Sequence, residues 1–261
     1  MKATITVLPL LSALAVSCAS TSSVPINPNQ AVRTSPSLVA QGASLFEQMK
    51  QKSKISRDPA KNAAVRRVAT RLRQVIPLQN ADWEFVVFDN NQPNAFALPG
   101  GKVGINSGIF QITQNDAGLA TVIGHEIAHV ILNHGGKRQQ QGSLMAIGGL
   151  VLDGILSTGG AASGTRDIAG SLYGAGTNVG VALPHSRSAE LEADKLGTIY
   201  MARAGYNPNE AVALWRRFGA WKQKTGAGQT SEFLSTHPVG ETRIRALEAF
   251  MPQALQEYRS R

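Results

Sequence analysis

The chain has a single cysteine, Cys18, among its 261 residues. An intramolecular disulfide is therefore excluded, and so is a small disulfide-stapled scaffold. Long apolar runs are also absent. The stretch Ile5–Val16 is too short to span a bilayer, and repeated glycines with Asp153 interrupt the apolar patch Leu144–Leu156. The glycine-rich region 142–180 is instead predicted to form helical pieces and a loop near the functional site, with no role that the sequence identifies.

Acidic residues are few. The chain has 17 Asp and Glu against 26 Lys and Arg, which gives a net charge of +9. Such an excess suits nucleic acid, but the basic residues are scattered and no stretch interleaves them with aromatic side chains. We therefore expect no nucleic-acid partner. A solvated basic surface, or one that faces anionic lipid head groups or acidic partners, fits the pattern better.

The N-terminus has the anatomy of a secretion signal over residues 1–17, with Lys2 ahead of the apolar stretch. Small residues lead to Cys18, as in a bacterial lipoprotein cleavage site, where the cysteine is lipidated. Ordinary cleavage after Ser17 is the alternative, because Ala15 stands where lipoproteins usually have leucine. Both predict export. A lipidated chain is expected at the periplasmic face of the outer membrane, and an unlipidated one in the periplasm, although the sequence does not fix which membrane holds the anchor.

Residues 18–37 are rich in Ser, Thr, Pro and Asn, which predicts a flexible tether. One folded domain is expected over 38–261. Helical spacing and β-rich runs alternate along it, and Pro99-Gly100-Gly101-Lys102 forms a turn signal between two short extended pieces. These patterns predict an α+β fold that is mostly helical, with a small sheet or hairpin beside the central helix. The expected helices are 38–49, 58–75, the central one after 113, one from 207 and 241–258, and the expected extended segments are 83–88, 94–98 and 103–105.

The central helix carries the first chemical signal. Thr113 and Asp116 match a capping box, and an apolar helical pattern continues to the Gly135-Gly136 pair. Within it lies His125-Glu126-Ile127-Ala128-His129. Residues four apart are neighbours on a helix, so both imidazoles can reach one zinc ion while Glu126 faces a metal-activated water. The five-residue pattern also occurs by chance, but histidines on an apolar helix face need partners.

Catalytic zinc takes three protein ligands and leaves a position open for water. His134 is the nearest candidate, but on a continuous helix it lies about 180° around the axis from His125. Leu132 also stands where a related motif needs glycine to turn the chain back. His134 is therefore interpreted as a helix-end histidine that is favourable to the helix dipole.

A downstream acidic segment offers the better third ligand. Glu190 and Asp194 share a helix face, so Glu190 can bind zinc while Asp194 accepts a hydrogen bond from the far ring nitrogen of a ligand histidine. Glu192 points about 200° away and is expected to be solvated or paired. An ordinary acidic surface helix is the alternative, which the upstream motif disfavours.

The sequence resembles the M48 metallopeptidases, and specifically their soluble bacterial lipoprotein branch. The resemblance extends from about Ala60 to Arg245. It rests on four separated pieces in the right order: Asn94-Ala95-Phe96-Ala97 with Pro99-Gly100-Gly101, His125-Glu126-x-x-His129, Ser186-Arg187 with Glu190-x-x-x-Asp194, and His237-Pro238 with Arg243.

The resemblance implies one zinc ion per chain, held by His125, His129 and Glu190, with Glu126 as the general base. The implied reaction is hydrolysis of an internal peptide bond. Zinc activates water and polarises the scissile carbonyl, while Glu126 takes the water proton and delivers it to the leaving amine. Family members often act in envelope or membrane protein quality control, so misfolded or misassembled envelope proteins are the expected substrates.

Three further pieces each allow more than one role. The segment Asn94, Ala95, Phe96 and Ala97 is either an edge strand that pairs with substrate main chain or an ordinary hairpin. His237 stabilises the oxyanion, occupies the open zinc position as a latency device, or is structural. Arg243 stabilises the oxyanion or pairs with a nearby carboxylate.

Two non-enzymatic functions also fit the sequence. In one, the protein is an assembly or holding factor for envelope proteins in which proteolysis is secondary or latent. In the other, the zinc is structural and a fourth residue closes its site, which leaves Glu126 without a task.

Overall fold

A computed structural model of the chain describes residues 26–137, 185–225 and 232–259. The expected signal segment 1–17, Cys18 and the glycine-rich region 142–180 lie outside the described residues. Among the described residues, no helix is both long and apolar enough to cross a membrane.

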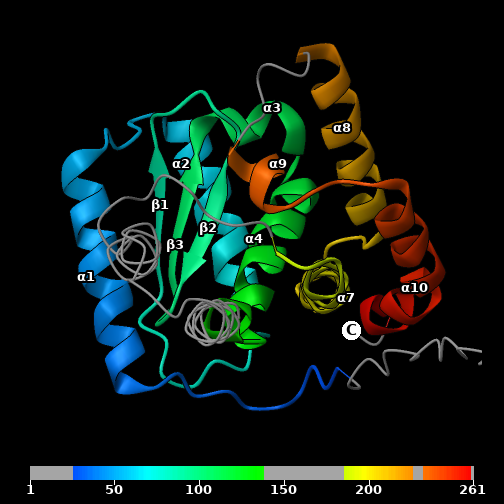
Figure 1. Ribbon diagram of the computed structural model, residues 1–261, viewed down its shortest axis with the longest axis horizontal. Helices are drawn as coiled ribbons and strands as arrows, with labels where there is room; N and C mark the ends of the chain where they lie inside the picture. The colour runs from blue at the N-terminus through cyan, green and yellow to red at the C-terminus, as the bar shows by residue number, and fades with distance from the viewer. Residues whose placement is uncertain (1–25, 138–184, 226–231, 260–261) are drawn as a thin grey trace, which may run out of the picture.

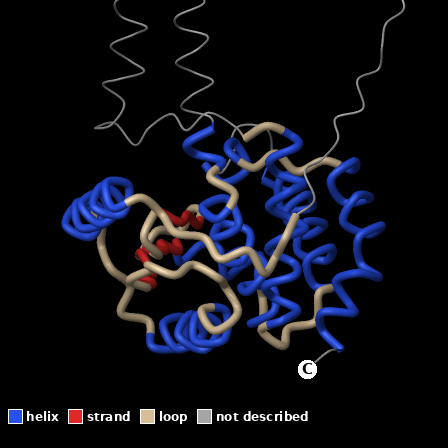
Figure 2. Tube along the Cα trace, turned by 90° about the horizontal axis from the view of Figure 1, so that it is seen from below, coloured by secondary structure: helices blue, strands red, loops and turns tan. Residues whose placement is uncertain are grey.

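The described part of the chain is a mostly helical α+β fold, which confirms the predicted fold class (Figure 1). The sheet lies between α1 on one side and α4 on the other, and α7, α8 and α10 lie beyond α4 (Figures 1 and 2). The strands are β1 Glu84–Phe88, β2 Ala95–Leu98 and β3 Lys102–Asn106. The helices are α1 Pro36–Lys52, α2 Pro59–Leu72, the 3-10 turn η1 Ser107–Ile109, α3 Phe110–Thr113, α4 Asp116–Ile131, α7 Arg187–Arg203, α8 Asn209–Thr225, α9 Glu232–Thr236 and α10 Glu241–Arg259.

The sheet has the strand order β1-β3-β2, so β2 is an edge strand. β2 and β3 form the predicted antiparallel hairpin, whereas β1 pairs with β3 in parallel. Gly100 and Gly101 both have a φ of +87° at the turn, a conformation that glycine adopts without steric cost. Phe96 lies across β3 at Gly104, where an added Cβ would stand 2.1 Å from the phenyl ring. The hairpin therefore depends on glycine at both its turn and its centre.

The ordered domain begins earlier than the predicted tether allows. Val32 forms a bridge with Leu78, and α1 already starts at Pro36. The Arg203 side chain also donates to the carbonyl of Pro28 and to Asn29. Residues 26–37 thus differ from the flexible segment expected over 18–37. This stretch is held by these hydrogen bonds and by Ile26 and Val32, which pack against the core.

Helix α4 begins later than the predicted capping box. Asn115 is its N-cap, and its side-chain oxygen accepts a hydrogen bond from Gly118 N at 2.7 Å. Thr113 instead ends α3 and is buried. Gln114 separates the two helices with a φ of 62°. The Thr113 cap was wrong because a reversal of the backbone, which the apolar pattern does not reveal, lies between the two positions.

Helices α4 and α7 cross in direct backbone contact. A Cβ built on Gly197 would lie 2.7 Å from the backbone nitrogen of His125, and one on Gly124 would lie 2.9 Å from the carbonyl oxygen of Gly197. Only glycine permits this approach. The crossing holds the acidic face of α7 directly against the histidine face of α4.

Candidate metal centre

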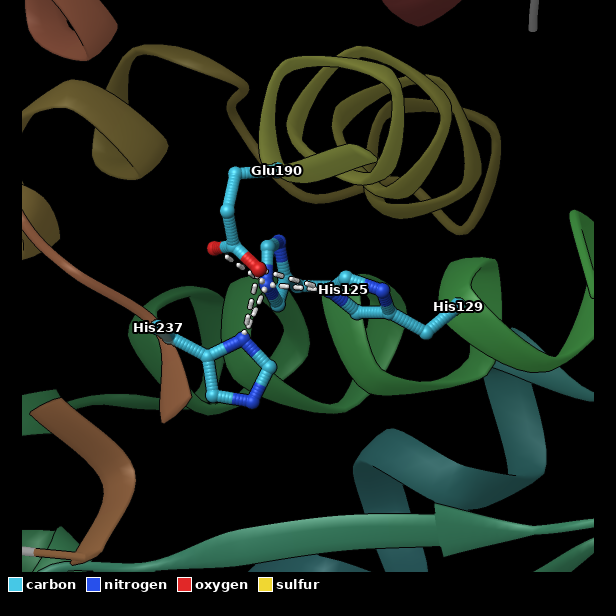
Figure 3. Close-up of side chains that lie close together, drawn as sticks. All are labelled: His125, His129, Glu190 and His237. Carbon is cyan, nitrogen blue, oxygen red and sulfur yellow. Dashed lines mark hydrogen bonds and ion pairs between the residues drawn. The ribbon is translucent and has the colours of Figure 1, made fainter. Parts of the chain in front are cut away.

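Two histidines of α4 begin the site. His125 and His129 stand one turn apart on the buried face of the helix, and their Nε2 atoms lie 3.1 Å from each other. Glu190 reaches them from the first turn of α7, with Oε1 3.3 Å from His129 Nε2 and Oε2 3.5 Å from His125 Nε2. His237 follows α9 and places Nδ1 3.2 Å from His125 Nε2 and 3.0 Å from Glu190 Oε1. Figure 3 shows these four side chains converging from three separate segments.

The four side chains fit a tetrahedral zinc ion. Their ligand atoms all lie within 4.8 Å of one another. Bonds of about 2.0–2.1 Å to a tetrahedral zinc set neighbouring ligand atoms about 3.3 Å apart, and the contacts between these side chains are 3.0–3.5 Å. Imidazole and carboxylate are also the ligand types that zinc prefers. The structure thus brings together the three predicted ligands and adds His237 as a fourth.

Asp194 and Arg243 support this cluster from behind. Asp194 Oδ1 lies 3.0 Å from His125 Nδ1, on the ring edge that faces away from the other ligands. Arg243 donates hydrogen bonds from Nε and Nη2 to the two carboxylate oxygens of Asp194, and its Nη1 lies 2.6 Å from Glu190 Oε2. Its guanidinium also covers the ring of Trp215 at 3.8 Å. The structure therefore pairs Arg243 with carboxylates, and its part in catalysis stays a prediction.

The electrostatics of the cluster differ between its two helix α4 histidines. Burial lowers the pKa of His125, but its hydrogen bonds to Asp194 and Glu190 outweigh burial and raise that pKa to about 9. Burial lowers the pKa of His129, which keeps its ring neutral. Burial opposes ionisation of Glu190, but hydrogen bonds from three histidines hold its pKa below the usual range. The neutral ring of His129 and the ionised carboxylate of Glu190 are ready for a cation, whereas His125 must release a proton before it can bind one.

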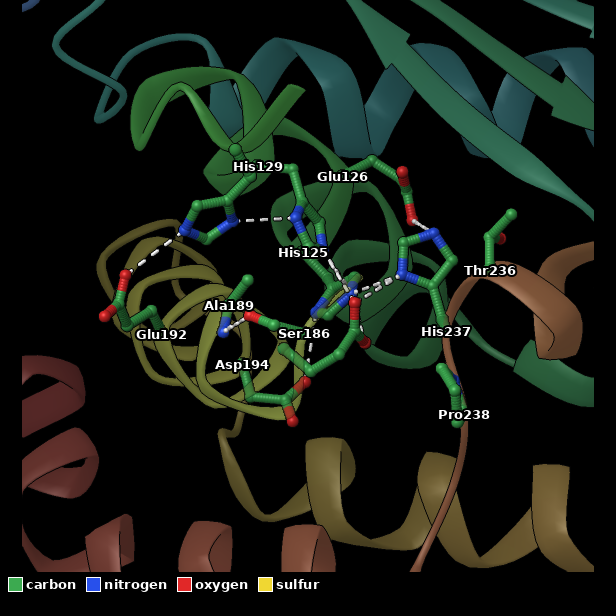
Figure 4. A network of polar contacts seen from close by, with 12 residues as sticks. His125, Glu126, His129, Ser186, Ala189, Glu192, Asp194, Thr236, His237 and Pro238 are labelled. Atoms are coloured by element: carbon green, nitrogen blue, oxygen red, sulfur yellow. Dashed lines mark hydrogen bonds and ion pairs between the residues drawn. The ribbon is translucent and has the colours of Figure 1, made fainter. Parts of the chain in front are cut away.

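Glu126 lies beside the cluster without belonging to it. Its side chain is buried, and among the described residues its Oε1 has no hydrogen-bond partner. The Nε2 atom of His237 lies 3.4 Å from Glu126 Oε1 (Figure 4). Burial raises the pKa of the Glu126 carboxyl. A carboxyl group that lacks a fixed partner and ionises less readily than usual is suited to accept a proton and release it again.

His134 was expected to lie opposite His125, and this expectation was wrong. Its Nδ1 lies 2.8 Å from Nδ1 of His129, and its Nε2 lies 3.2 Å from Glu192 Oε2. The helical extrapolation fails because α4 ends at Ile131 and Asn133 takes a left-handed φ of 53°, which turns the chain back. Asparagine adopts this conformation more readily than most residues. The Asn-His pair after an apolar helix was the sequence signal for this reversal.

His185 was also not anticipated as part of the site. Its ring stacks on His129 with centroids 4.0 Å apart, and its backbone nitrogen donates to the carbonyl of Thr236. The chain has five histidines, and all of them lie in this one network of ring contacts.

The segment Asn94, Ala95, Phe96 and Ala97 lies outside the ligand cluster. The last three of these residues belong to edge strand β2, which packs against α4. Ala95 is buried, whereas the other three are partly exposed. The position beside the motif helix is compatible with substrate pairing, which stays a prediction.

The amino-acid sequence is similar to those of known proteins. A family-wide sequence model described as Peptidase family M48 matches residues 59–251. The chain is 35% identical over 190 residues to the mitochondrial metalloendopeptidase OMA1 of Schizosaccharomyces pombe, which covers 73% of this chain and 53% of that protein. It is 36% identical over 185 residues to OMA1 of Saccharomyces cerevisiae, covering 69% of this chain and 50% of that protein.

A bacterial relative is more distant. The chain is 28% identical over 211 residues to the beta-barrel assembly-enhancing protease of Yersinia pestis, which covers 79% of this chain and 42% of that protein. The chain thus spans about half the length, or less, of these curated relatives.

Proposed function

Since the chain belongs to peptidase family M48, we propose that it is a zinc-dependent endopeptidase that hydrolyses internal peptide bonds. One observation carries the proposal. Two imidazoles and a carboxylate present ligand atoms within 4.8 Å of one another, beside a buried glutamate that has no hydrogen bond at Oε1 among the described residues. A structural zinc site explains the ligands but gives Glu126 no task.

The proposed mechanism divides the work among four residues. His125, His129 and Glu190 hold the metal. Zinc, when bound, would act as a Lewis acid that lowers the pKa of the attacking water and polarises the scissile carbonyl. Glu126 takes the proton of that water on its carboxylate and then delivers it to the leaving amine, so no covalent intermediate with the protein is needed.

His237 stands at the fourth corner of the ligand set, which supports the latency role over the oxyanion role. A catalytic zinc needs that corner open for water. The Nδ1 of His237 lies 3.0 Å from Glu190 Oε1, and its Nε2 lies 3.4 Å from Glu126 Oε1, so its ring contacts both a ligand and the proposed base. We propose that this arrangement is a closed state and that His237 must move before substrate is cleaved.

The proposed substrates are misfolded or misassembled cell-envelope proteins. The beta-barrel assembly-enhancing protease relatives support this choice, although the OMA1 relatives are mitochondrial and more similar in sequence. A lipid anchor on Cys18 would place the domain at the periplasmic face of the outer membrane. Edge strand β2 would bind extended substrate through its main chain, which tolerates varied side chains.

The substitution Glu126→Gln tests the mechanism. It removes the base without removing a ligand, so the variant is expected to bind zinc as the wild type does and to lose cleavage of casein. The matched control is Glu248→Gln, on the exposed surface of α10, which is expected to keep both properties. Cleavage by Glu126→Gln at the wild-type rate contradicts the mechanism. A wild-type protein that never cleaves casein but prevents its aggregation favours the holding-factor function instead.

A further inference from the structure

We infer that Glu192 and His134 form a relay that fixes the tautomer and ring orientation of His129, which makes both of them positioning residues for the metal centre. Figure 4 shows the network that extends from Glu192 through the imidazoles to His237 and Glu126. This inference rests on the proposed zinc site, and it concerns two residues that bind no metal themselves.

The contact between Glu192 and His134, at the outer end of the network, determines where the protons lie. An ionised carboxylate can only accept hydrogen bonds, so the contact of 3.2 Å between Glu192 Oε2 and His134 Nε2 places a proton on that nitrogen. Nδ1 of a neutral His134 then carries a lone pair. It lies 2.8 Å from Nδ1 of His129, so His129 must donate across this contact. His129 Nε2 is left with a lone pair directed at the ligand cluster.

The other histidine ligand, His125, is held in a similar way, but no second histidine stands between it and its carboxylate. Asp194 Oδ1 contacts His125 Nδ1 directly, at 3.0 Å. Both histidines therefore have a carboxylate of α7 behind them, and the one behind His129 acts through His134. A hydrogen bond to the outer ring nitrogen fixes a ligand histidine's tautomer and makes it a better ligand.

The two relay residues differ in burial, because His134 lies inside the protein and Glu192 at its edge. His134 is 4% exposed, so water does not replace its partners. The Glu192 side chain is 26% exposed, so the relay ends at the edge of the protein. The left-handed backbone of Asn133 puts His134 between the two, where a continuing helix would carry it away.

The relay is tested by comparing Glu192→Gln with Glu192→Asp and with the surface control Glu248→Gln. The amide of glutamine is uncharged and can donate as well as accept, so it no longer selects one tautomer of His134. We expect Glu192→Gln to bind zinc about 10–100-fold more weakly in competition with a chromophoric chelator. We expect Glu192→Asp, which keeps the charge, to recover part of the affinity. Glu248→Gln should match the wild type.

Two readouts separate positioning from a general structural role. The melting temperature of metal-free Glu192→Gln should equal that of the wild type, while the visible spectrum of its cobalt-loaded form should shift because the ligand geometry relaxes. Wild-type zinc affinity and an unchanged cobalt spectrum in Glu192→Gln would overturn the relay. So would a loss of affinity explained by a matching loss of melting temperature. A wild-type protein that binds no zinc overturns the proposed function, and the relay with it.

Discussion

The crossing of α4 and α7 gives the sharpest prediction. We expect Gly197→Ala to weaken the metal site without replacing a ligand. A Cβ at this position would stand 2.7 Å from the backbone nitrogen of His125 and 2.8 Å from the carbonyl carbon of Gly124. Both are backbone atoms, so no side-chain rotation relieves the clash. Ordinary contacts begin at 3.4 Å, so the two helices must separate locally by 0.7 Å, the difference between 3.4 and 2.7 Å.

The cost of this separation can be estimated from two opposing effects. Overpacking a well-packed interior destabilises a protein by about 1–3 kcal/mol. Replacing glycine by alanine inside a helix returns about 0.5–1 kcal/mol. We therefore expect a net loss of up to about 2.5 kcal/mol, which lowers the melting temperature by up to roughly 10 °C in a domain of this size.

We expect Gly197→Ala to reduce zinc affinity more clearly than it reduces the free energy of unfolding. Glu190 approaches the metal from α7, whereas both histidine ligands approach from α4. Ligand distances in a zinc site are defined within about 0.2 Å, so a helix shift of several tenths of an ångström spoils the geometry. We expect at least a tenfold loss of zinc affinity in a chelator competition assay.

The matched control is Gly219→Ala on α8. A Cβ there would meet no atom of the described residues within 4 Å. This variant should keep the wild-type zinc affinity and melt at the wild-type temperature or slightly above it. If Gly197→Ala behaves like Gly219→Ala in both assays, backbone contact does not position the site and the reasoning is refuted.

Three further predictions address the helix cap, the closed state and the metal. Asn115→Ala should destabilise the domain by about 1 kcal/mol because it removes the cap of α4, whereas Asn115→Ser, which also loses the hydrogen bond to Glu210 but keeps a capping oxygen, should recover most of that loss; equal melting temperatures for the two variants would contradict the cap. His237→Ala should retain zinc and cleave casein faster than the wild type does, and slower cleavage would indicate an assisting role. Removal of zinc with a chelator should abolish cleavage while the helical circular dichroism persists, and added zinc should restore it; cleavage that resists chelation would exclude the proposed metal dependence.

The predictions that rested on local periodicity agree with the structure. The spacing of His125, Glu126 and His129 implied one face of a helix, and the spacing of Glu190 and Asp194 implied one face of another. These inferences need only helical geometry, which is the same in every protein. The hairpin likewise followed from its turn residues.

Two of the failures share one physical cause, which is a change of backbone direction at a residue that is not glycine. Gln114 and Asn133 both have a positive φ, and they mark the two ends of α4. Because of the turn at Gln114, the cap of α4 is Asn115 and not Thr113. Because of the turn at Asn133, the ring of His134 contacts His129. The parallel pairing of β1 with β3 was not foreseen either, because it joins segments whose contact no local pattern encodes.

The gathering of every histidine into one network bears on how the protein exchanges protons with its surroundings. Histidine is the side chain whose ordinary pKa lies between pH 5 and 8, and the chain has five, all at the metal centre. The rest of the sequence therefore contains no histidine. A proton released near neutral pH when zinc binds is therefore expected to come from the site itself, and calorimetry in buffers of different ionisation enthalpy can count such protons.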